Sequence, residues 1–115
     1  DVSEENGTVY LLPYSEIGVK SRVTHEREEG TNDMVGYWGD NPGIPVIVPA
    51  GSVAVFSSVC FHRSGANKSD KMRRVMLTQY SKGPIVNSFT GEQLFQGVPF
   101  LKDGKIVYTE KDAVS

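Results

Sequence analysis

Short apolar runs, separated by turn-forming residues, set the pattern of this chain. The longest run extends over Val53–Phe61 and follows the turn residues Pro49-Ala50-Gly51. Both alternating faces of the run are largely apolar, which is typical of a strand buried between two layers. We therefore predict a central β-strand over Val53–Phe61. One face of this strand and its end would carry Ala54, Phe56, Ser58, Cys60 and His62.

Further strands are predicted on both sides of this run. Their segments are rich in β-branched and aromatic residues and are closed by proline or turn residues; they are Thr8–Leu12, Val46–Val48 and Val75–Tyr80. Near the C-terminus, Phe100–Tyr108 is typical of a hairpin. Asp103-Gly104 there supplies the two positive-φ positions of a type I′ turn.

Helical periodicity is weak along the whole chain. Ser15–Glu29 is polar and has no sustained 3.6-residue period, so we expect an excursion loop with room for one helical turn. Gly30–Asn41 is also loop-like, with Met34–Trp38 as a candidate short strand. Together the runs and turns predict an all-β sandwich or jelly roll in a single domain, residues 1–115.

Composition removes several classes of function. Lys and Arg number 12 against 14 Asp and Glu, so the net charge of −2 argues against nucleic-acid binding, which needs clustered basic residues. No apolar run approaches the ~20 residues that a membrane-spanning helix requires. The single cysteine, Cys60, excludes an internal disulfide and a multi-thiolate zinc site. The single free cysteine and the absence of a signal peptide lead us to expect a cytoplasmic location.

Candidate chemistry is concentrated in residues 49–80. The predicted central strand ends at His62, a polar loop follows, and Arg73 and Arg74 open the next strand. A histidine at a strand end is accessible and rigidly held, as a metal ligand requires. An arginine on an adjacent strand can bind a carboxylate through two charge-assisted hydrogen bonds. Plainer roles stay open: a histidine bonded to a loop carbonyl, and solvated arginines paired with Asp70.

Three sequence segments together carry a resemblance to a known family. The first is His62-x-Ser64-Gly65-x-Asn67, with Arg73 following eleven positions after the histidine. The others are Glu5–Ser15 (ENGTVYLLPYS) and Pro49–Val53 (PAGSV). In this order the segments resemble the phytanoyl-CoA dioxygenase family, which belongs to the non-haem Fe(II)/2-oxoglutarate oxygenases. Residues 81–115 match no part of that pattern.

The resemblance implies roles for individual residues. His62 corresponds to the second iron-binding histidine and Arg73 to the arginine that binds the distal carboxylate of 2-oxoglutarate, while Arg74 points to the other face. Ser64 and Asn67 lie where the family's loop shapes the cosubstrate end, although both also suit turn-making through side-chain bonds to the backbone. The implied fold is a double-stranded β-helix, which is a jelly-roll or cupin-like sandwich. No separate catalytic residue is implied.

The chain departs from the family at the iron site. The facial triad needs two histidines and a carboxylate, and a His-x-Asp pair before the Asn-Gly strand supplies two of these ligands. Here only five residues precede Asn6, and none is histidine. His25, beside Glu26 and Glu28, is an alternative ligand, but a solvated charged loop explains it more simply. We therefore expect the C-terminal part of a dioxygenase-like jelly roll that lacks its N-terminal strands.

Two functions stay open at this point. The first is part of an Fe(II)/2-oxoglutarate-dependent oxygenase that hydroxylates a small molecule and is inactive alone, because its His-x-Asp ligands are absent. The second is a non-catalytic β-sandwich module that binds a small molecule or a partner. In either case, we expect exposed sheet edges to pair copies into a homodimer or higher oligomer. An upstream His-x-Asp pair in a longer reading frame would favour the enzyme.

We predict that this chain alone holds iron weakly or not at all, because His62 would supply one ligand where the facial triad needs three. Metal analysis of the chain, purified without added metal, should find iron far below one atom per chain. Stoichiometric, tightly bound iron would contradict the prediction and revive His25 as a ligand.

Overall fold

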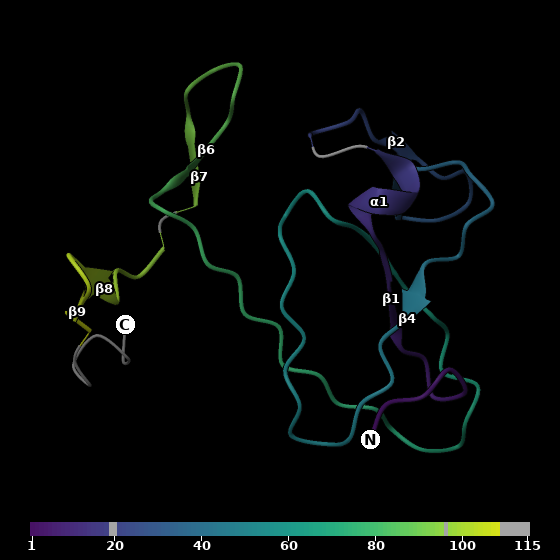
Figure 1. Cartoon of the computed structure of the whole chain (residues 1–115). Coiled ribbons are helices and arrows are strands. Elements are labelled where there is room, and N and C mark those ends of the chain that lie inside the picture. The colour runs from purple at the N-terminus through teal and green to yellow at the C-terminus, as the bar shows by residue number, and fades with distance from the viewer. Residues whose placement is uncertain (19–20, 96, 109–115) are drawn as a thin grey trace. The chain divides into compact units, whose positions relative to one another are not determined.

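The computed structural model of the chain describes residues 1–18, 21–95 and 97–108 (Figure 1). Short strands dominate it and form small antiparallel sheets, which confirms the all-β prediction at that level. The jelly-roll arrangement stays a prediction. The chain divides into two compact units, residues 1–75 and the part that begins at Met76, and each is described by itself. The single-domain expectation also stays a prediction.

A three-stranded sheet in the order β4-β1-β5 organises the first unit. Its strands are β1 (Val9–Leu12), β4 (Ile44–Pro45) and β5 (Phe61–Ser64). The predicted strand Thr8–Leu12 is confirmed as β1, which begins one residue later. β1 lies in the middle because both of its edges form antiparallel ladders. Its apolar end is buried, with Leu12 only 4% exposed.

The turn before β1 docks on the loop after β5. A Cβ added at Gly7 would lie 2.6 Å from the Gly65 carbonyl oxygen and 2.8 Å from the Asn67 nitrogen, and Gly7 has a positive φ of 84°. The Gly65 N–H donates to the Thr8 carbonyl over 2.7 Å, and the Lys68 N–H donates to the Glu5 carbonyl over 2.9 Å. Only glycine fits a backbone that approaches so closely with this φ. The segment Glu5–Ser15 and the motif that begins at His62 therefore contact each other in the structure.

The predicted continuous strand over Val53–Phe61 is wrong. A turn interrupts the run, because the Cys60 N–H donates to the Ser57 carbonyl over 3.0 Å and the Val59 N–H donates to the Ser57 hydroxyl over 3.3 Å. Serine forms such local bonds readily and so competes with a strand ladder. Regular pairing begins only at β5, and Val53, expected in a core, is 84% exposed.

Two other strand predictions also need correction. Val75–Tyr80 has no regular secondary structure, and Met76 in it is 90% exposed. A strand persists only where a neighbour completes its hydrogen bonds, and no strand of the described residues pairs with this segment. The second is the strand predicted over Val46–Val48. The strand β4 lies just before it, at Ile44–Pro45, and Val48 itself forms only an isolated bridge with Val2.

The polar region after β1 forms one helical turn and a small ribbon. α1 (Tyr14–Ile17) ends at Gly18, whose φ of 66° is left-handed and whose N–H donates to the Tyr14 carbonyl over 2.8 Å. β2 (Glu26–Arg27) pairs with β3 (Met34–Val35), so the candidate strand at Met34–Trp38 is confirmed in its first two residues. In the described parts of the chain, no helix is long and apolar enough to cross a bilayer.

The second unit consists of two hairpins among its described residues. Their strands are β6 (Ile85–Val86), β7 (Gln93–Phe95), β8 (Leu101–Lys102) and β9 (Lys105–Ile106). The predicted C-terminal hairpin is confirmed: its turn residues have positive φ, 51° at Asp103 and 74° at Gly104. This is the signature of a type I′ turn, which matches the twist of the two strands.

Replacement of Gly7 by alanine should destabilise the first unit more than the same change at Gly51. Gly51 has a similar φ of 87° but no atom within 4 Å of an added Cβ. Gly51→Ala therefore tests backbone strain alone, about 1–2 kcal/mol. Gly7→Ala adds a clash with backbone atoms, for a total loss of about 2–5 kcal/mol. Urea unfolding measures both losses, and equal losses would contradict the docking of the two motifs.

Candidate functional site

β5 places the sequence-predicted histidine and one serine on the same face of the three-stranded sheet. His62 pairs with Leu11 of β1, and Ser64 pairs with Val9. Because successive side chains alternate between faces, His62 and Ser64 project to one side and Arg63 to the other. Both His62 and Ser64 are exposed, so this side of β5 is open to a ligand.

The imidazole of His62 has a defined hydrogen bond and a defined ring neighbour. Nδ1 lies 3.0 Å from the Cys60 carbonyl oxygen, and since a carbonyl only accepts, Nδ1 carries the proton in the neutral ring. Nε2 is then the nitrogen with a lone pair. The ring of Phe56 lies 4.9 Å from the imidazole, centroid to centroid, at a tilt of 50°. A metal-ligating histidine commonly has this backbone-anchored arrangement.

The opposite face of β5 carries a separate polar cluster. The Arg63 guanidinium lies 3.9 Å from the centroid of the Tyr10 ring, and its Nε donates to the Pro42 carbonyl over 3.0 Å. The Tyr10 hydroxyl donates to the Glu4 carboxylate over 3.0 Å. Desolvation, then this hydrogen bond and the charge of Glu4, raise the pKa of the Tyr10 hydroxyl, while Arg63 opposes the rise. The cluster fixes Arg63 away from the His62 face.

Asn67 braces the loop that follows β5. Its side-chain amide donates to the Lys71 carbonyl over 2.7 Å, and its side-chain oxygen accepts from the Ser69 N–H over 2.9 Å and from the Ser69 hydroxyl over 2.7 Å. These bonds are the turn-making alternative that the sequence left open for Asn67. Its role at the cosubstrate end stays a prediction, and so does that of Ser64.

Arg73 and Arg74 differ in their surroundings. Arg73 is half-buried and Arg74 is exposed. The Nε of Arg73 is buried and has no hydrogen-bond partner. Such a group loses its hydration without compensation, which costs about 1–3 kcal/mol or more for a charged side chain. Within the described residues, no hydrogen bond, ion pair or ring contact joins Arg73 to His62, so the shared cavity stays a prediction.

The described residues do not assemble a complete metal centre. They contain no group of three or more His, Cys, Asp or Glu side chains placed to hold a metal ion. The alternative ligand, His25, is turned into its own ribbon: Nδ1 lies 3.0 Å from the Val23 carbonyl oxygen, and Nε2 lies 2.8 Å from where a Cβ of Gly36 would stand. Its ring therefore packs against backbone.

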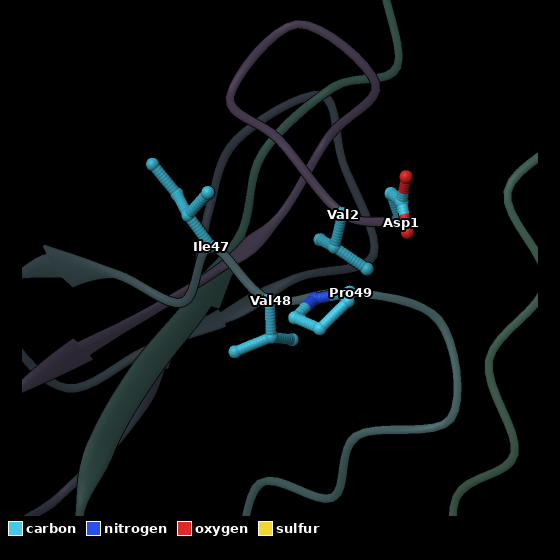
Figure 2. A pocket seen from close by; sticks show the side chains of 5 residues that line it. All are labelled: Asp1, Val2, Ile47, Val48 and Pro49. Carbon is cyan, nitrogen blue, oxygen red and sulfur yellow. The ribbon is translucent and has the colours of Figure 1, made fainter.

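Each unit has a hollow among its described residues. Figure 2 shows one of about 270 Å³ in the first unit, where the chain start meets the segment after β4; it is lined by Asp1, Val2, Ile47, Val48 and Pro49. Its lining is mostly aliphatic, and its one carboxylate, that of Asp1, already accepts from the Ala50 N–H over 2.9 Å. The other, of about 330 Å³, belongs to the second unit and is lined by Gln79, Ser81, Ile85, Phe95 and Gly97. None of the predicted site residues lines either hollow.

Sequence reasoning missed the contact between Phe56 and His62. Alternation placed both side chains on one face, but in a continuous strand a separation of six residues corresponds to about 20 Å. The turn at Ser57 brings the rings together instead. The available signal was the Ser57-Ser58 pair inside an otherwise apolar run.

Comparison with known proteins gives one family. The family model described as phytanoyl-CoA dioxygenase (PhyH) matches residues 1–75. The matched region coincides with the first compact unit and contains His62, Ser64, Asn67 and Arg73. No curated protein and no solved structure matches the chain.

Proposed function

The chain belongs to the phytanoyl-CoA dioxygenase family, and we propose that residues 1–75 supply one iron ligand and the cosubstrate clamp of an oxygenase. The family indicates an oxygenase-type function in general, and its members generally depend on Fe(II) and 2-oxoglutarate. The proposed reaction class is hydroxylation of a small-molecule substrate. The observation that carries the proposal for this chain is the buried, unpartnered Nε of Arg73.

Arg73 suits a carboxylate as its missing partner. Its orphaned Nε and a neighbouring terminal N–H of the guanidinium can donate side by side to the two oxygens of one carboxylate. A bound dicarboxylate would thus satisfy a group that is otherwise desolvated without a partner. Arg74 is exposed, so water can hydrate its guanidinium without a bound carboxylate.

His62 suits the role of a single iron ligand. Its Nδ1 is anchored on the Cys60 carbonyl, so Nε2 is the nitrogen available to a metal. In this proposal Ser64 lines the same face, and the loop braced by Asn67 shapes the cosubstrate end. When bound in a complete site, iron with 2-oxoglutarate supplies the oxidising power for hydroxylation. Because the described residues offer no set of three ligands, we derive no step through the metal.

A double-stranded β-helix stays our proposal for the complete fold. Large apolar side chains are exposed along the segment before β5, including Val53 and Val55 at 84% and 87%. A finished sandwich covers such side chains with a second layer. The pairing of copies into a homodimer or higher oligomer is one way to supply that cover, and the mass of the chain in solution tests it.

Arg73→Ala should weaken the binding of 2-oxoglutarate to the full chain by about ten- to hundredfold, since a charge-assisted contact contributes roughly 1.5–3 kcal/mol. Arg74→Ala is the matched control and should change the affinity less than twofold. Calorimetric titration with 2-oxoglutarate measures both. The clamp assignment is wrong if Arg74→Ala causes the larger loss, and the proposed site is wrong if the unaltered chain does not bind 2-oxoglutarate at all.

A further inference from the structure

The side chain of Phe56 has a specific relation to the imidazole of His62. The two ring centroids are 4.9 Å apart and the planes are tilted by 50°, within the range that aromatic pairs prefer. Phe56 is half-buried and His62 is exposed. The phenyl ring therefore contacts the imidazole where the imidazole is otherwise open to water.

The turn between the two residues is tied to the rest of the first unit. The Ser57 carbonyl accepts from the Cys60 N–H, which closes the turn, and the Ser57 and Tyr14 hydroxyls are hydrogen-bonded over 2.5 Å. Tyr14 opens α1, so the turn is held at one side by that helix. At the other side it continues into β5, which pairs with β1 along its whole length. Phe56 is thus placed on His62 by the fold, not by local chain flexibility.

A histidine ring turns easily about the bond to its Cβ, because this torsion has broad minima. The hydrogen bond from Nδ1 to the Cys60 carbonyl favours the tautomer with the proton on Nδ1 and directs that nitrogen toward Cys60. A single hydrogen bond at an exposed site competes with water and contributes only about 0.5–1.5 kcal/mol. The phenyl contact adds a restraint on the plane of the ring that water cannot replace.

We propose that Phe56 is a positioning residue that holds the His62 imidazole with its Nδ1–H on Cys60 and its Nε2 turned outward for a divalent metal ion. That Nε2 is presented to a metal ion rests on the proposed function, whereas the orientation of the His62 ring by Phe56 does not depend on it. A packing role alone would be met by any apolar side chain of similar volume. The positioning role requires a flat ring.

The test uses the full chain labelled with ¹⁵N at histidine and free of metal, at one alkaline pH. In the unaltered chain, NMR correlations within the ring should show His62 mainly as the Nδ1–H tautomer, with dipolar contacts between the His62 and Phe56 rings. Phe56→Leu should raise the share of the Nε2–H tautomer at least twofold. Phe56→Tyr retains the ring and should keep the original tautomer. His25, which lies in a different ribbon, is the internal reference.

A second measurement concerns the metal. Ni²⁺ added to the same samples should broaden the His62 ring signals, with an affinity that falls about two- to tenfold in Phe56→Leu and is restored in Phe56→Tyr. Phe61→Leu is a matched control, because Phe61 adjoins His62 in β5 but contacts Tyr37, at a centroid distance of 5.8 Å. It should leave the His62 tautomer and Ni²⁺ affinity unchanged.

The outcomes separate the two ideas. The positioning role is wrong if His62 has the same share of each tautomer in the unaltered chain and in Phe56→Leu. It is also wrong if the unaltered chain shows no contacts between the two rings, a test that does not require any variant to fold. If the tautomer shifts as expected but Ni²⁺ does not reach His62 in any sample, the positioning role stands and its metal-directed part fails. Failure of 2-oxoglutarate binding, by contrast, concerns Arg73 and leaves the ring orientation unaffected.

Discussion

Antiparallel pairing of β1 with β5 is the interaction on which the first unit depends. It joins residues 9–12 to residues 61–64, which are about fifty positions away in the sequence. The pairing sets His62 opposite Leu11 and brings the turn around Gly7 onto the loop at Gly65. Without it, the histidine and the loop that leads to Arg73 would have no fixed relation to the rest of the chain.

The sequence predicted the elements whose signals are local. β1 is a β-branched and aromatic run closed by Pro13, and the last hairpin follows from Asp103-Gly104, so both were predicted within a residue or two. The run over Val53–Phe61 failed because its apolar pattern and its turn chemistry disagree. Ser57 forms hydrogen bonds with Val59 and Cys60, and no strand of the described residues offers the run a ladder that would outweigh them.

The candidate site residues were chosen from the sequence by residue type and motif, which stays a prediction, and the sequence did not predict their contacts. Arg63 received no role from the sequence; the structure places it opposite Tyr10 in the ladder and over the Tyr10 ring, and alternation along the strand separates it from His62. The use of Asn67 as a brace for Lys71 and Ser69 depends on how one loop closes, which spacing does not determine. The burial of the Arg73 Nε, with no hydrogen-bond partner, is a feature of the three-dimensional structure that no sequence pattern indicated.

The turn that interrupts the apolar run also brings together the two groups that orient the His62 imidazole. A straight strand would carry Phe56 about 20 Å from His62 and leave the imidazole restrained by one hydrogen bond. With the turn, the same side chain lies against the ring, and the Cys60 carbonyl at the end of the turn accepts from Nδ1. Both restraints on His62 therefore come from residues 56–60, while the pairing with β1 holds its backbone. The loss of a regular strand and the orientation of a candidate ligand have one cause, the local hydrogen bonds of Ser57.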